Sequence, residues 1–251
     1  MMYRVSLILA LILSLLLFGC ASQQVTTLPD VAGQTWDYVV IGSSIGTWWM
    51  AHYGSLLESN LSVKIVYKSY YVANQKVSAL LDRVMNDEFL REDIRNAEVI
   101  TIGIGFADTT EAIYVYGASH ANDRAKLQQE LKTFRETYNS MLTEVVSLAP
   151  PTHTIIRIMD FYCPYVRRHT EDGVYGSTKR DWKSFNEVIV QAGRQHGIPV
   201  ARVFQAFNGP SGDDDPDDRG YLSGDGTHPT LEGYKLIAEE FRKLGYQYLS
   251  Q

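Results

Sequence analysis

The sequence predicts an α/β domain in which helices cover both faces of a parallel sheet. Short apolar runs alternate with longer amphipathic stretches, the pattern expected when each strand is followed by a crossover helix. The 251 residues are 45% hydrophobic and 21% charged, a composition that suits one globular core. No internal repeat and no second core interrupts the alternation, so we expect a single domain.

Five apolar, β-branched runs have the length of buried strands. They span residues 38–41, 63–67, 99–102, 154–158 and 200–203. Three stretches have helical periodicity, at residues 123–148, 178–196 and 229–244. In the last stretch Pro229 fits the first helical position and Gly245 a C-terminal cap.

The N-terminus has the layout of a secretory signal peptide. Arg4 precedes an apolar run over residues 5–18, which is shorter than the about 20 residues that a membrane-spanning helix needs. The run ends in Leu17-Phe18-Gly19-Cys20, which resembles a bacterial lipobox, where the cysteine is lipidated.

We therefore expect a lipoprotein signal peptide at residues 1–19, a lipid on Cys20 and a polar tether at residues 20–35. The folded domain then occupies residues 36–251, with folding starting near Trp36. The alternative is an uncleaved N-terminal anchor. In both cases the domain lies outside the cytoplasm, tethered to the cell membrane or the outer membrane.

Charge and cysteine content exclude several classes of protein. The formal net charge of −6 argues against a nucleic-acid partner, because such binding depends on clustered Lys and Arg. Two cysteines, Cys20 and Cys163, cannot form a disulfide-stapled scaffold or a four-thiolate zinc site. Cys163 is expected to be a small apolar filler.

The first strand runs into a sharp turn with the sequence Gly42-Ser43-Ser44-Ile45-Gly46. A dinucleotide-binding turn has glycines in a related pattern, but Ser44 replaces the middle glycine and the second strand ends without an acid for a ribose. The turn also matches the G-x-S-x-G elbow of α/β-hydrolases. There, however, the nucleophile normally follows a strand in the middle of the sheet.

A third interpretation joins this turn to the far end of the chain. Asp225 and His228 lie three residues apart, just before the last helix. This spacing lets the carboxylate hold one imidazole nitrogen while the other faces outward. A serine that is activated by histidine needs such a third group to fix the tautomer and stabilise the imidazolium. An early Ser44 and a late D-x-x-H therefore complete a possible triad.

With these residues the chain resembles the SGNH (GDSL-type) hydrolase family, over roughly residues 36–246. The family's Gly-Asp-Ser block reads Gly42-Ser43-Ser44 here, and its Asp-x-x-His-Pro block matches Asp225, His228 and Pro229. The resemblance implies a three-layer α/β/α sandwich with five parallel strands in flavodoxin-like order. It further implies a serine esterase that acts on a carbohydrate or lipid ester and needs no metal or organic cofactor.

The family stabilises the oxyanion with three donors, and two of them differ here. The backbone N–H of Ser44 is retained, whereas Ala73 stands at the position of the family's glycine and Ala107 at that of its asparagine. Alanine keeps the backbone N–H at position 73. Asn74, next in the chain, is a candidate for the missing amide, so the expected oxyanion hole comprises Ser44, Ala73 and Asn74.

Two other functions remain open from the sequence. A non-catalytic ligand-binding domain would explain the alanines at positions 73 and 107, and an acyltransferase would use the same triad with water excluded.

Several further groups are more simply structural than functional. The acidic run Asp213 to Asp218 suits a solvated loop better than a calcium site. Five histidines lack a partner at catalytic or metal spacing: His52, His120, His153, His169 and His196. Aromatic residues near the expected site could hold substrate or fill the core: Trp48, Trp49, Tyr162, Tyr165 and Tyr175.

Overall fold

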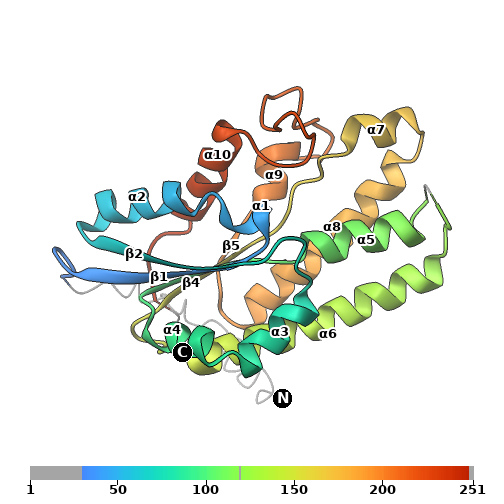
Figure 1. Ribbon diagram of the computed structural model, residues 1–251. Coiled ribbons are helices and arrows are strands. Elements are labelled where there is room, and N and C mark those ends of the chain that lie inside the picture. The colour runs from blue at the N-terminus through green and yellow to red at the C-terminus, as the bar shows by residue number, and fades with distance from the viewer. Residues whose placement is uncertain (1–29, 119, 249–251) are drawn as a thin grey trace, which may run out of the picture.

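The computed structural model describes residues 30–118 and 120–248, and these form one α/β unit (Figure 1). Its sheet has five parallel strands in the order β2-β1-β3-β4-β5. The strands are β1 (Thr35–Gly42), β2 (Lys64–Tyr71), β3 (Val99–Gly103), β4 (Ile155–Met159) and β5 (Val200–Ala201). The predicted fold class and the flavodoxin-like strand order are confirmed.

Helices cover both faces of the sheet. One layer contains α2 (Met50–Leu61), α9 (Val203–Asn208) and α10 (Leu231–Arg242). The other contains α3 (Val77–Asn86), α4 (Glu88–Asn96), α5 (Phe106–Tyr116), α6 (Arg124–Leu148) and α8 (Tyr175–Gln195). Two short helices follow strand ends, α1 (Ser44–Thr47) and α7 (Val166–Glu171). The central strands β1, β3 and β4 are almost entirely buried between the layers.

The expected signal peptide and Cys20 lie outside the described residues. The end of the segment expected to be a tether is described, and it packs against the domain. Val31 is buried in the core, and the Gly33 N–H donates to the Ser62 carbonyl at 2.7 Å. Among the described helices, none combines the length and the apolar character needed to cross a membrane.

Two of the predicted boundaries near the site were wrong because a helix starts at a different residue. The last strand ends at Ala201 rather than at residue 203, because Val203 opens α9 and the Phe204 N–H donates to Asp160. Pro229 does not open the last helix. Thr230 is its N-cap, with the hydroxyl accepting from the Gly233 N–H at 3.2 Å, as threonine does at helix starts. Gly245 has φ +70°, as expected for a glycine beyond a helix end.

Three glycines let the turn after β1 lie directly on β3. A Cβ atom on Gly46 would come within 1.9 Å of the Gly103 carbonyl oxygen, and one on Gly42 within 2.2 Å. Gly42 also has φ +149°, a conformation that other residues rarely adopt. The first residue of α1, Ser44, is thereby held at the end of β1, beside the end of β3.

We expect Gly46→Ala to destabilise the domain by about 3 kcal/mol, because its methyl group overlaps backbone that cannot move aside like a side chain. Gly176→Ala in α8 is the matched control, since a Cβ there meets nothing within 4 Å. Thermal denaturation checks both variants. A Gly46→Ala protein as stable as the Gly176→Ala protein would contradict the close packing of α1 on β3.

Candidate active site

A short hairpin presents the residues Asp225 and His228 at the carboxyl edge of the sheet. Leu222 and Pro229 form an antiparallel bridge, and the Ser223 N–H donates to the His228 carbonyl at 2.7 Å. The Tyr162 hydroxyl donates to the Thr227 carbonyl at 2.5 Å from the segment that follows β4. The loop that carries Asp225 and His228 is therefore held in place by the bridge at its two ends and by the hydrogen bond from Tyr162.

Ser44, His228 and Asp225 form a continuous chain of hydrogen bonds. The Ser44 Oγ lies 2.9 Å from His228 Nε2, and His228 Nδ1 lies 2.6 Å from an Asp225 carboxylate oxygen. If Nδ1 carries the proton and donates it to Asp225, Nε2 is left as the acceptor for the Ser44 hydroxyl. The three predicted residues are thus in contact across 184 positions of sequence.

The Asp225 carboxylate is kept ionised by the donors around it. Burial alone would raise its pKa, but four hydrogen bonds outweigh that effect and hold the pKa well below its usual range. The donors are the backbone N–H groups of Thr227 and His228, the His228 imidazole and the Ser223 hydroxyl. Asp225 can therefore balance the charge of an imidazolium while its position is fixed by the loop.

Trp48 lies over His228 as a stacked ring. The ring centroids are 5.3 Å apart and the planes are inclined by 17°. Trp48 is 51% exposed, whereas Trp49 is fully buried and stacks on Phe241. Of the two adjacent tryptophans, one therefore fills the core and the other borders the serine and histidine.

Two of the three expected oxyanion donors, Ala73 and Asn74, lie on the turn after β2. The Val72 N–H donates to the Gly42 carbonyl at 3.1 Å, which places this turn beside the end of β1. Within the described residues the Ala73 N–H donates to no acceptor, and Ser44, as the first residue of a helix, has no intrahelical acceptor for its own. Asn74 has φ +52° and is exposed. Both backbone donors and the Asn74 amide are therefore available.

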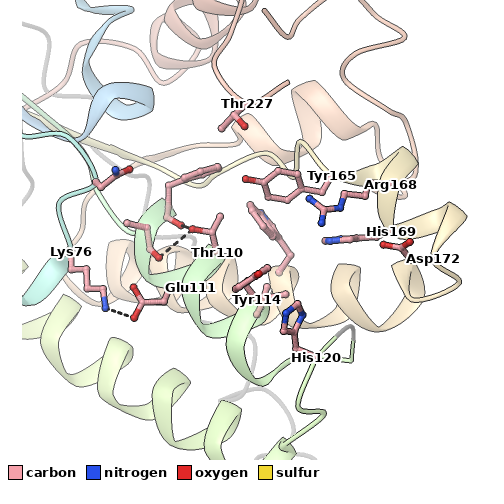
Figure 2. Close-up of a pocket in the computed structure, with 15 residues that line it drawn as sticks. Lys76, Thr110, Glu111, Tyr114, His120, Tyr165, Arg168, His169, Asp172 and Thr227 are labelled. Atoms are coloured by element: carbon pink, nitrogen blue, oxygen red, sulfur yellow. Dashed lines mark hydrogen bonds and ion pairs between the residues drawn. The ribbon is translucent and has the colours of Figure 1, made fainter. Parts of the chain in front are cut away.

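A cavity of about 640 Å³ opens beside these residues (Figure 2). Asn74, Ala107 and Thr227 line its wall. Asn74 is an expected oxyanion donor, Thr227 precedes His228, and Ala107 stands where the family has its third donor. Most of the remaining wall comes from α5, α7 and α8. Sequence patterns did not single out this cavity, and His120, Arg168 and His169, which also line it, carry no motif.

Two of the remaining aromatic residues and the acidic run have structural roles. Tyr162 and Tyr175 are buried, and Tyr165 lines the cavity. Arg167 pairs with Asp215, Asp217 and Asp218, and Lys179 pairs with Asp213, so basic side chains neutralise the acidic loop.

Cys163 and the histidines other than His228 do not combine into a second centre. Burial raises the pKa of the Cys163 thiol to about 12, which keeps it protonated and unreactive. His153 has a partner that its sequence context did not indicate, Glu98 at 2.8 Å. The described part of the chain contains no group of three or more His, Cys, Asp or Glu side chains placed to hold a metal ion.

Known proteins share both the sequence pattern and the fold. Residues 40–236 match the GDSL-like lipase/acylhydrolase family. The spore germination lipase LipC of Bacillus licheniformis is 22% identical over 216 residues, which cover 84% of this chain and 93% of LipC.

Two solved structures illustrate the similarity of fold. The lipase Lip_vut3 from a goat rumen metagenome has a TM-score of 0.71 and 21% identity, covering 86% of this chain and 100% of that one. A catalytic mutant of Axe2, an acetylxylan esterase from Geobacillus stearothermophilus, has a TM-score of 0.57 and 17% identity, covering 87% and 98%. With the family match spanning most of its length, the chain belongs to the GDSL-like lipase/acylhydrolase family.

Proposed function

We propose that the protein is a serine ester hydrolase in which Ser44, His228 and Asp225 act as a catalytic triad. The hydrogen-bonded chain from Ser44 Oγ through His228 to Asp225 is the observation that carries this proposal. The named activities of similar proteins, lipases and an acetylxylan esterase, support ester hydrolysis and suggest a lipid or carbohydrate ester as substrate.

The mechanism is a two-step acyl transfer. His228 Nε2 takes the Ser44 proton as Oγ attacks the ester carbonyl, and the Ser44 and Ala73 N–H groups with the Asn74 amide stabilise the oxyanion. The carbon–oxygen bond to the alcohol then breaks, and the alcohol leaves with the proton from His228. Water repeats the sequence on the acyl-enzyme and releases the acid. The chain's own groups carry out every step of this mechanism.

Two assays test this function: covalent labelling by a fluorophosphonate probe and hydrolysis of 4-nitrophenyl acetate. We expect covalent labelling at Ser44 and release of nitrophenol, and neither in Ser44→Ala. A wild-type protein that neither hydrolyses the ester nor takes up the probe would instead favour a ligand-binding domain. The sequence feature that supports this alternative is the pair of alanines at positions 73 and 107. Transfer of the acyl group to an added alcohol in place of water would identify an acyltransferase.

We expect Trp48→Ala to lower kcat/KM for 4-nitrophenyl acetate by about two- to fivefold, because an aromatic face stabilises the imidazolium by about 0.5–1 kcal/mol at exposed sites. Trp48→Phe, which keeps an aromatic face, is expected to retain most of the activity. Steady-state kinetics measure both variants. Equal losses in the two would mean that Trp48 acts through its size and not through its ring.

We further propose that the enzyme works outside the cytoplasm on a membrane, held by a lipid on Cys20 after removal of residues 1–19. The support is the apolar run and the lipobox-like Leu17-Phe18-Gly19-Cys20. Metabolic labelling with a fatty-acid analogue in a bacterial host tests this. Label should enter the wild-type chain and be lost in Cys20→Ser, whereas an uncleaved anchor would leave both unlabelled and membrane-bound.

A further inference from the structure

The cavity beside Ser44 has an apolar interior. Its walls include the buried side chains of Phe106, Ile113 and Trp182, with Tyr114 and Tyr165 nearer the surface. Phe106 and Trp182 meet edge to face, with ring centroids 5.7 Å apart. A volume of about 640 Å³ lies within the usual range for small-molecule sites. The interior can therefore receive a hydrocarbon group and remove it from water.

Within residues 30–118 and 120–248, one cation on the wall of this cavity has no ionic partner. Lys76 is already paired with Glu111 at 2.7 Å, which raises the pKa of that lysine and satisfies both charges. Arg168, on α7, forms no ion pair or side-chain hydrogen bond with another residue of the described chain. Its neighbour Arg167 points elsewhere and binds three aspartates of the acidic loop.

Arg168 is directed into the cavity. Figure 2 shows its side chain extending toward Tyr165, whereas the Asp172 carboxylate lies beyond His169. Burial, and then the charge of Arg168, lower the pKa of His169, so this imidazole is neutral at neutral pH and adds hydrogen-bonding capacity without charge. An anionic group in the cavity would meet a guanidinium whose donors are free.

The proton transfer determines which part of the ester substrate lies next to His228. The alcohol oxygen must lie against His228 Nε2 to receive its proton, and one face of His228 is covered by Trp48, which does not line the cavity. Asn74, an expected oxyanion donor, and Ala107 line the cavity, as does Thr227 beside His228. With the alcohol on the exposed side at Trp48, which lies outside the cavity, the cavity is left to the acyl group.

We infer that the substrate's acyl group is a hydrocarbon chain ending in a carboxylate, which pairs with Arg168, so that the enzyme hydrolyses half-esters of dicarboxylic acids. This inference rests on the proposed ester hydrolase function. Attack by Ser44 forms an acyl-enzyme and expels the alcohol with the proton from His228. Water then cleaves that ester and releases the dicarboxylate.

A matched set of substrates tests the terminal charge. The 4-nitrophenyl monoesters of adipic, suberic and sebacic acid are compared with the same esters capped by a methyl group on the free carboxyl. In the unaltered enzyme the ratio of kcat/KM for free over capped substrate is expected to reach about tenfold or more at the best length, as a charge-assisted hydrogen bond provides. In Arg168→Gln the ratio is expected to fall to about one.

Arg167→Gln is the control, because Arg167 pairs with the acidic loop and does not line the cavity. It should retain both the ratio and the activity. A ratio near one at every chain length in the unaltered enzyme overturns the inference. So does a ratio that persists in Arg168→Gln.

A binding measurement separates failure of this inference from failure of the proposed function. Titration calorimetry on Ser44→Ala compares monomethyl suberate with dimethyl suberate. We expect the charged compound to bind at least about tenfold more tightly, and the difference to disappear in Ser44→Ala with Arg168→Gln. Absence of binding, or equal binding of both compounds, overturns the inference. This result does not depend on whether the protein hydrolyses any nitrophenyl ester. If the unaltered protein does not hydrolyse 4-nitrophenyl acetate but binds the two suberates as expected, only the proposed function is contradicted.

Discussion

Asparagine in place of Asp225 is expected to lower kcat for ester hydrolysis by roughly 10⁴-fold while leaving the loop in place. The backbone N–H groups of Thr227 and His228 and the Ser223 hydroxyl all donate to Oδ1, which asparagine retains. The change falls on the other oxygen, which lies 2.6 Å from His228 Nδ1. An amide nitrogen at that place donates a hydrogen bond where the carboxylate accepted one.

The consequence is a change of tautomer at His228. With Nδ1 accepting from the new amide, the proton moves to Nε2, and Nε2 then donates toward Ser44 Oγ across 2.9 Å. Such an imidazole cannot take the serine proton, so both nitrophenol release and fluorophosphonate labelling should slow together. Steady-state kinetics and the rate of probe labelling measure the effect.

Thermal denaturation and His228→Ala provide the controls. Asp225→Asn should unfold near the wild-type temperature, because the hairpin bridge and its donors are kept. His228→Ala removes the base itself and should cost at least as much activity. A loss of less than about tenfold in Asp225→Asn would show that Asp225 does not orient His228.

The candidate triad was predictable because each half lies in a short local pattern. Gly42 and Gly46 frame Ser44 at the turn where α1 lies directly against β3, and Asp225 and His228 belong to one loop. The contact between the halves then follows from topology, because the carboxyl ends of parallel strands share one edge of the sheet. Ser44 follows β1 beside β3, at the point where the strand order reverses.

The cavity could not be predicted, since it exists only through tertiary packing. Phe106 and Ile113 come from α5, Arg168 from α7 and Trp182 from α8, and no spacing in sequence joins them. α7 has six residues, and its Val-Arg-Arg-His-Thr-Glu sequence has the composition of an ordinary surface helix.

The first residue of the last helix was hard to predict for a different reason, because two local sequence preferences compete there. Pro229 and Thr230 are both favourable near a helix start. The bridge from Pro229 to Leu222 keeps the proline in the hairpin and leaves the cap to Thr230.

Asparagine in place of Ala107 is expected to raise kcat/KM for 4-nitrophenyl acetate by up to about 10²- to 10³-fold, because one well-placed oxyanion donor contributes about 3–4 kcal/mol. Ala107 is the second residue of α5 and lines the cavity, as does Asn74. A longer side chain there also takes up space in the cavity. The gain should therefore shrink, or turn into a loss, for 4-nitrophenyl esters of long acyl chains.

Ala107→Leu separates the two effects, since leucine is close to asparagine in size but has no amide. Ala107→Leu should lower kcat/KM for esters of long acyl chains as Ala107→Asn does, but it should not raise kcat/KM for the acetate ester. Steady-state kinetics on the acetate and octanoate esters give the comparison. Equal rates on the acetate in the two variants would contradict a donor role for the new amide.

Asn74 decides how large that gain can be, because its own amide is the candidate donor in the unaltered enzyme. If Asn74 already supplies the third donor, Asn74→Ala alone lowers acetate hydrolysis, and the same change costs little once Ala107→Asn is present. If Asn74 supplies none, Asn74→Ala leaves the rate unchanged in both backgrounds, and the full benefit of Ala107→Asn appears. The double-mutant cycle thus shows whether the chain replaced its missing amide from the turn after β2 or works with two backbone donors.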